Sequence, residues 1–169
     1  MTFVALACAV GVVTGCGSSS SPPPASALQV RPVLAEHRAG AGDCPAAVVQ
    51  QPPSASPVQA CSGDGQFVFR LGPAAVSGGE FTNLEVEATA PGGGAAVSAS
   101  LDAAGAQALA DLTGSLAGKA APENQFAIYV HGQVQSAPFV QGRIAGDQLV
   151  IAGFGTAVDA QRFVDALRS

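Results

Sequence analysis

The sequence predicts an α+β fold: a small antiparallel sheet, built of two meanders, with two helices packed on one of its faces. Short runs with apolar residues at every second position recur between glycine- and proline-rich turns, as in antiparallel strands. Two longer segments place apolar residues at helical spacing behind good N-cap residues. The 169 residues suffice for one domain with a core of its own.

The first predicted strands lie between residues 29 and 101. Gln29–Leu34 is predicted as an edge strand, because Pro32 has no N–H to donate in a central one. Three further strands are predicted at Gln66–Leu71, Phe81–Ala90 and Ala95–Leu101. The last two flank a proline- and glycine-rich turn and should pair with each other.

The first helix is predicted over Asp102–Ala117, with Asp102 as N-cap and Gly118 just past its end. Its apolar stripe consists of Leu101, Ala108, Leu109, Leu112 and Leu116. A glycine inside a helix costs about 1 kcal/mol relative to alanine, so Gly105 predicts close packing at that position.

The second meander contains the strongest strand pattern of the chain. In the run Phe126–Val130 every second side chain is large and apolar, which predicts a strand with one buried face. His131 and Gly132 follow as a two-residue hairpin turn. Pro138 must end the return strand or leave it at a sheet edge, and Gln148–Ile151 is the third run.

The last helix is predicted over Ala157–Arg168. Thr156 is its N-cap, with Asp159 at the position of a capping box. Its buried face consists of Ala160, Phe163, Val164 and Leu167.

Four segments in order resemble the head of the first extracytoplasmic domain of SecD, the protein-export subunit. They are NQFAIYVHGQVQSAPFV at 124–140, QVRPVL at 29–34, FRLGP at 69–73 and LDAAGAQALADLTGSLA at 101–117. The resemblance covers most of the chain after Leu28. The chain departs from the family at His131, where an aspartate is common, and at Gly155, which separates Phe154 from Thr156.

The N-terminus is typical of a bacterial lipoprotein. An apolar run, Thr2–Val13, has the length of a signal-peptide core, and it leads into Val13-Thr14-Gly15-Cys16, which fits a lipobox. We expect residues 1–15 to be a signal peptide, Cys16 to be lipidated, residues 16–27 to be a Ser/Pro tether and residues 28–169 to be the SecD head-like domain. The alternative is an N-terminal helix with an incidental cysteine, and no Lys or Arg precedes the apolar run.

The remaining cysteines predict a disulfide. Cys8 would leave with the signal peptide and Cys16 would be acylated, so Cys44 and Cys61 remain as a pair in an oxidising compartment. A metal site is the alternative, but His37 is the nearest imidazole and no Cys-x-x-Cys spacing occurs.

No motif points to catalysis or to a cofactor. His37 and His131 lie in unrelated segments, and Ser136 has no glycine elbow around it. The alternating Glu85 and Glu87 are typical of a solvated strand face. A net charge of −5 argues against binding to nucleic acid and to anionic lipid.

The resemblance implies a function in protein export or at the cell envelope. SecD heads contact emerging polypeptide, and this chain shows no membrane helix bundle that would couple proton flow to movement. We expect a non-enzymatic lipoprotein, anchored on the extracytoplasmic face of the cell membrane, that adds an extended polypeptide to a sheet edge near Pro32 or Pro138. The polypeptide would be a secreted chain or part of an export or envelope complex. A structural adaptor that docks on a membrane complex without binding substrate is the alternative, and an envelope hydrolase ranks third.

Overall fold

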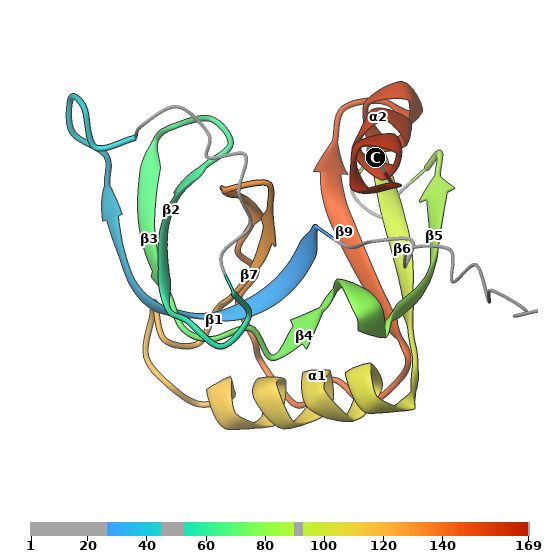
Figure 1. The fold of residues 1–169 in the computed structure, drawn as a ribbon, viewed down its shortest axis with the longest axis horizontal. Coiled ribbons are helices and arrows are strands. Elements are labelled where there is room, and N and C mark those ends of the chain that lie inside the picture. Colours follow the sequence, from blue (N-terminus) through green and yellow to red (C-terminus); the bar gives the residue numbers. More distant parts are fainter. Residues whose placement is uncertain (1–26, 45–52, 90–92, 169) are drawn as a thin grey trace, which may run out of the picture.

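The computed structural model describes residues 27–44, 53–89 and 93–168. Within them, two β-sheets and two α-helices form the fold (Figure 1). The larger sheet rolls into a barrel, and a three-stranded sheet stands beside it. One α-helix packs on the three-stranded sheet, and the other runs along the base of the molecule as drawn in Figure 1.

Five strands of the described chain close the barrel. They are β1 (Leu28–Arg38), β2 (Val58–Ser62), β3 (Phe67–Leu71), β7 (Phe126–Val130) and β8 (Gln133–Ser136). Their order is β3-β2-β8-β7-β1, and β3 pairs again with β1, which completes the ring. Neighbours are antiparallel except β2 and β8, which are parallel. A short strand, β4 (Val76–Ser77), adds to the start of β1.

The three-stranded sheet consists of β5 (Phe81–Glu87), β6 (Ala95–Leu101) and β9 (Gln148–Phe154), with β6 in the centre and antiparallel neighbours. Helix α2 (Ala157–Arg168) packs against all three strands. Helix α1 (Ala103–Leu116) contacts β1, β4 and β6, so it joins the two sheets. A 3-10 turn, η1 (Gly78–Glu80), leads from β4 into β5.

The predicted single antiparallel sheet with two helices on one face is therefore wrong, although the fold is α+β. The run Phe126–Val130 explains why. Its alternation predicts one buried face, but every residue of β7 is buried. Its even-numbered side chains face the main core, and Ala127 and Tyr129 face the interior of the barrel. In sequence, a strand buried between two cores has the same pattern as a half-exposed strand when its second face carries a small residue and a tyrosine.

The two cores differ in size and position. The larger lies between the three-stranded sheet, both helices and the outer face of β1 and β7. The smaller fills the barrel and consists of Val33, Ala60, Phe69, Leu71, Ala127, Tyr129 and Val134. Burial of these side chains is the main favourable contribution to folding, at about 25 cal/mol per Å² of apolar surface.

Strand β1 is central, not the predicted edge strand. It pairs with β7 on one side and with β4 and then β3 on the other. Pro32 is tolerated because it lies between Val30, the last residue paired with β4, and Val33, the first paired with β3. The Pro32 carbonyl accepts the N–H of Gly72 (2.9 Å). The Pro32 nitrogen points to the same side of β1, where no strand-pairing hydrogen bond needs an N–H at this position. Strand β8, which Pro138 follows, pairs with β7 on one side and, as far as Val134, with β2 on the other.

The helices agree with the prediction to within one residue at each end. Asp102 caps α1 by accepting the N–H of Gly105 (2.8 Å), and Gly118 follows the helix with a φ of 81°. The Thr156 hydroxyl accepts the N–H of Asp159 (3.2 Å) at the start of α2. A Cβ on Gly105 would lie 2.9 Å from the Cβ of Glu80 in η1 and 3.2 Å from Cδ2 of Leu101 in β6, so close packing does require glycine there.

The strands agree less well. The sequence analysis misses β2 and β4, because β2 lies in the proline-rich segment between the cysteines and β4 has only two residues. Strand β5 ends at Glu87 instead of Ala90, and β9 continues to Phe154 instead of Ile151. The predicted two-residue turn is confirmed: His131 and Gly132 both have positive φ, 46° and 87°, as a type I′ hairpin turn requires.

Candidate functional site

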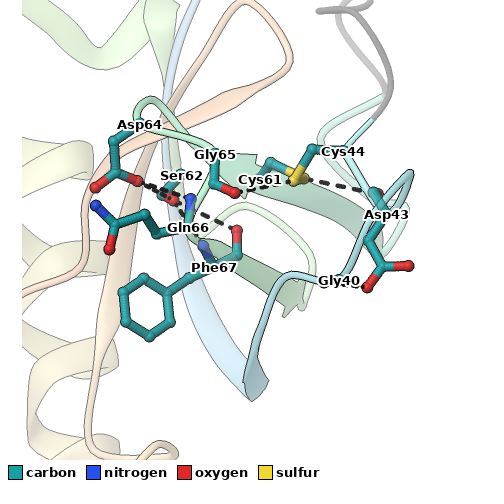
Figure 2. Close-up of a disulfide and its surroundings, with 9 residues drawn as sticks. All are labelled: Gly40, Asp43, Cys44, Cys61, Ser62, Asp64, Gly65, Gln66 and Phe67. Atoms are coloured by element: carbon teal, nitrogen blue, oxygen red, sulfur yellow. Dashed lines mark hydrogen bonds between the residues drawn. A yellow bond between two sulfur atoms is a disulfide. The ribbon is translucent and has the colours of Figure 1, made fainter.

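The two cysteines of the described chain are joined, in the pairing that the sequence analysis expects. The sulfur atoms of Cys44 and Cys61 lie 2.07 Å apart, and their Cα atoms 5.7 Å apart. Because Cys61 lies in β2, the bond ties the chain that follows β1 to the β2–β3 hairpin (Figure 2). Cys16, the predicted lipidation site, lies outside the described residues.

The turn between β2 and β3 is held by hydrogen bonds beside the disulfide. The Ser62 hydroxyl donates to the Asp64 carboxylate (2.6 Å) and accepts the N–H of Phe67 (3.0 Å). The same carboxylate accepts the N–H of Gln66 (3.0 Å). These bonds, the one from Ser62 first, lower the pKa of Asp64, so this exposed side chain is charged at neutral pH. Figure 2 shows Asp64 and the Phe67 ring on one side of the hairpin and the disulfide on the other.

A hollow of about 290 Å³ opens beside this turn, and we call it the barrel mouth. Its floor is apolar and continuous with the barrel core; it consists of Phe67, Phe69, Val134 and Ala137. Its rim is polar and consists of Ser62, Gly63, Asp64, Gln135 and Ser136. The barrel mouth therefore offers apolar surface to a ligand within a ring of hydrogen-bonding groups.

One wall of the barrel mouth is a strand with a partly paired edge. β2 and β8 are in register over two residue pairs, the second of which joins Ser62 to Val134. The N–H of Gly63 then donates to the Val134 carbonyl (3.0 Å), and the chain turns away into the hairpin. Gln135 and Ser136 have no registered partner on β2. By comparison β1 and β3 register over five pairs, so the β2–β8 seam is the shortest around the described barrel.

The interior of the barrel contains a fully buried arginine, Arg31. Its Nε donates to the side-chain oxygen of Gln29 (2.7 Å), and its guanidinium lies 5.5 Å from the ring centroid of Tyr129. Its other nitrogens donate to three main-chain carbonyls, those of Pro53 (3.2 Å), Ser56 (2.7 Å) and Gly72 (2.8 Å). Arg31 thus fixes the segment that precedes β2 onto the barrel.

Burial inside the barrel shifts the pKa of Arg31 and the pKa of Tyr129. Desolvation lowers the pKa of Arg31, and the nearby Tyr129 opposes that shift. Desolvation raises the pKa of Tyr129, and the positive charge of Arg31 opposes that shift. The neutral phenol and the hydrogen-bonded guanidinium are structural parts of the core, and neither side chain lines the barrel mouth.

The other residues considered for chemistry lie on different elements. His37 is exposed on β1, Ser136 lies at the barrel mouth, and Glu85 is exposed on β5, where it accepts a hydrogen bond from Asn83 (2.8 Å). The Nε2 atom of His131 is 3.0 Å from the carbonyl oxygen of Ala166, so this ring ties the hairpin turn to α2. No hydrogen bond joins any two of these candidates within the described ranges.

The described residues contain no group of three or more His, Cys, Asp or Glu side chains placed to hold a metal ion. None of their helices is both long enough and apolar enough to cross a bilayer.

Neither the burial of Arg31 nor the barrel mouth follows from the sequence pattern. Arg31 alternates with Leu28 and Val30, a pattern that reads as the solvent face of an edge strand. The barrel mouth combines residues from β2, β3 and β8, and only closure of the ring brings them together. The one available signal is that Gln29 and Arg31 lie on the same face of one predicted strand.

Comparison with known proteins assigns a family. Residues 56–169 match the family model described as SecDF, P1 head subdomain. Over 100 residues the chain is 35% identical to the protein translocase subunit SecD of Streptomyces coelicolor, which covers 59% of this chain. The aligned part is 18% of the length of that subunit, so the chain corresponds to less than a fifth of it.

Two solved structures share the fold. One is SecDF in its super-membrane-facing form, with a TM-score of 0.57 and 20% identity over 86% of this chain and 19% of that chain. The other is SecDF described as a membrane component that enhances protein export, with a TM-score of 0.55 and 21% identity over 86% of this chain and 63% of that chain.

Proposed function

The chain belongs to the family of SecDF P1 head subdomains, and we propose that it is a non-enzymatic extracytoplasmic lipoprotein whose head domain binds extended polypeptide during protein export. Membership of the SecDF P1 head family supports the part of the proposal that concerns protein export. The observation that carries the binding function is the barrel mouth, where an apolar floor lies beside the incompletely paired end of β8. An extended chain can add to such an edge through main-chain hydrogen bonds that are tolerant of sequence.

Of the two edges expected from the sequence, only the one near Pro138 enters this proposal. The strand that contains Pro32 has neighbours on both sides, so its main-chain groups face other strands. Strand β8, which Pro138 follows, is paired with β2 only as far as Val134, so its end at Gln135 and Ser136 is the candidate edge.

The proposed domain organisation places the head on a lipid anchor. Residues 1–15 form the signal peptide, Cys16 carries the acyl chains, residues 16–27 are the tether and residues 28–169 are the head domain. The lipobox at Val13–Cys16 supports this organisation. Acyl chains contribute about 0.8 kcal/mol of membrane affinity per buried methylene, so a diacylated cysteine holds a protein firmly at the bilayer.

Palmitate labelling tests the anchor. Cys16→Ala should abolish label incorporation and leave unprocessed precursor, whereas Cys8→Ala, the matched control within the apolar run, should incorporate label normally. Unchanged labelling of Cys16→Ala would show that the anchor lies elsewhere.

Titration with a client protein tests the binding function. The full chain is reconstituted in lipid nanodiscs and titrated with a permanently unfolded client and with its folded parent, with empty nanodiscs as the blank. We expect a Kd of about 1 μM or weaker, near −8 kcal/mol, for the unfolded form and none for the folded form. Equal binding of both forms, or binding of neither, would contradict the proposal.

A structural adaptor is the second candidate function, and one surface favours it. The outer face of the three-stranded sheet carries mainly short and polar side chains, which include Asn83, Glu85, Ser98, Ser100 and Gln148, around the exposed Val150. A mixed surface of this kind suits docking on a folded partner. If crosslinks in cells form from this face to a membrane complex and none forms from the barrel mouth, the adaptor function is the correct one.

A further inference from the structure

The end of β8 is suited to pairing with one short segment. Gly63 occupies the Val134 carbonyl, and Gln135 and Ser136 follow it without a registered neighbour on β2. The strand therefore offers an open edge only as far as Ser136, since Pro138 has no N–H to extend a ladder. The edge is short: an added strand would pair with Gln135 and Ser136 at most.

The floor of the barrel mouth selects for an apolar side chain. The rings of Phe67 and Phe69 lie 6.5 Å apart between centroids, tilted by 44°, and Val134 and Ala137 complete the surface. A hollow of about 290 Å³ is at the lower end of the range for ligand pockets. It has room for one or two side chains of an extended chain and not for a folded element.

The rim of the barrel mouth carries a negative charge. Asp64 is the charged residue among those that line it. Its carboxylate is fully exposed, and the bonds from Ser62 and Gln66 hold it in place. The guanidinium of Arg38 lies 5.5 Å from the centroid of the Phe67 ring, but Arg38 does not line the mouth. A positively charged ligand group would therefore find its partner at Asp64.

We propose that the barrel mouth binds an extended polypeptide segment that pairs with the end of β8, places an apolar side chain on the surface formed by Phe67 and its neighbours, and places a lysine or arginine at Asp64. The proposal rests on the proposed polypeptide-binding function and specifies its substrate class: short β-forming segments in which a basic residue stands beside apolar ones. Alternate residues of a strand share one face, so the basic residue lies two positions from the apolar one.

Fluorescence anisotropy with defined peptides tests this assignment. The probe is a fluorescein-labelled nonapeptide of alternating valine and threonine with one central lysine, titrated with the full chain in nanodiscs. A second peptide carries glutamate in place of the lysine, and a third carries proline at alternate positions to remove main-chain donors. We expect the lysine peptide to bind about threefold more tightly than the glutamate peptide, as exposed ion pairs allow, and the proline peptide to bind at least tenfold more weakly.

Variants of the protein test whether the peptides bind at the barrel mouth or respond only to the overall charge of the protein. Asp64→Lys should invert the preference, so that the glutamate peptide binds better than the lysine peptide; this rescue shows that the hairpin is still folded. Asp111→Asn, an exposed carboxylate on α1, is the matched control and should leave both affinities unchanged. Gln135→Pro should weaken both peptides by at least fivefold.

The outcomes separate this assignment from the proposed function. If the unfolded client binds but Asp64→Lys and Gln135→Pro bind all three peptides as the wild type does, polypeptide binds elsewhere on the head and only this assignment is overturned. If neither the client nor any peptide binds, both the assignment and the proposed function are wrong. If Asp64→Lys makes the glutamate peptide bind better than the lysine peptide, both the assignment of the site and the proposed function are supported.

Discussion

At the scale of single residues, the least expected feature is Arg31 inside the barrel. Its charge is compensated by carbonyl oxygens and by the face of Tyr129, and no carboxylate contacts it within the described chain. Three of the acceptors are main-chain atoms of segments that precede β2 or follow β3. The hydrogen bonds from Arg31 therefore hold these segments in place at one end of the barrel, where main-chain pairing between strands would otherwise do so.

Arg31→Met should lower the free energy of unfolding by about 2–4 kcal/mol, because the buried carbonyls of Ser56 and Gly72 lose their donors. Arg70→Met is the matched control, since Arg70 is exposed on β3, and it should change stability by less than about 0.5 kcal/mol. Urea unfolding measures both. A loss below about 1 kcal/mol for Arg31→Met would mean that water replaces the guanidinium at little cost.

The buried phenol gives a second residue-level prediction, on pH. Tyr129 is the only tyrosine of the chain, so absorbance at alkaline pH follows its ionisation directly. Because burial raises its pKa in the folded state, folding stability should be complete below the ordinary tyrosine pKa and should fall as pH rises through the folded-state value. Tyr129→Phe should lack this part of the alkaline loss. A native titration that coincides with the denatured one would place the phenol in solvent.

At the scale of elements, the barrel depends on close approaches that the backbone must permit. A Cβ on Gly72 would lie 2.8 Å from Cγ of Pro32, where β1 passes from β4 to β3. Gly72→Ala should therefore cost about 1–3 kcal/mol of stability. Gly79→Ala is the matched control, since nothing lies within 4 Å of the added Cβ, and it should be nearly neutral. Equal melting temperatures of the two variants would show that β1 shifts freely.

The disulfide gives a second element-level prediction. Thiol titration of the denatured, unreduced protein should detect no free thiol at Cys44 or Cys61, and two free thiols would contradict the bond. A double substitution to alanine should lower stability by about 3 kcal/mol on the chain-entropy model, because the bond closes a loop of 17 residues. The effect should be largest in the β2–β3 hairpin, which hydrogen exchange measures residue by residue.

The elements also show what the sequence could and could not predict. Both helices and the His131–Gly132 turn follow from local signals, namely caps, an apolar stripe and a glycine with positive φ. The barrel does not follow from such signals, because its closure depends on β3 pairing with both β1 and β2. Strand β2, with proline and serine before it, carries a weak local pattern and is held by its neighbours. The barrel mouth could not be predicted without that pairing.

At the scale of the whole molecule, the two cores share strands β1 and β7, and helix α1 contacts both sheets. Strands β1 and β7 present one face to the barrel core and the other to the main core. Helix α1 lies across the base of both sheets (Figure 1). The residues that line the barrel mouth belong to β2, β3, β8 and the turns that follow β2 and β8, and none of them belongs to the three-stranded sheet.

The most direct test of polypeptide binding at the barrel mouth is photo-crosslinking in cells. A photoreactive phenylalanine analogue is placed at Gln135, on the rim of the barrel mouth, or at Gln148, on the outer face of the three-stranded sheet. The account predicts that the probe at Gln135 crosslinks to secreted chains during their export and that the probe at Gln148 does not. Crosslinks to secreted chains from Gln148 alone, or from neither position while export proceeds, would contradict it.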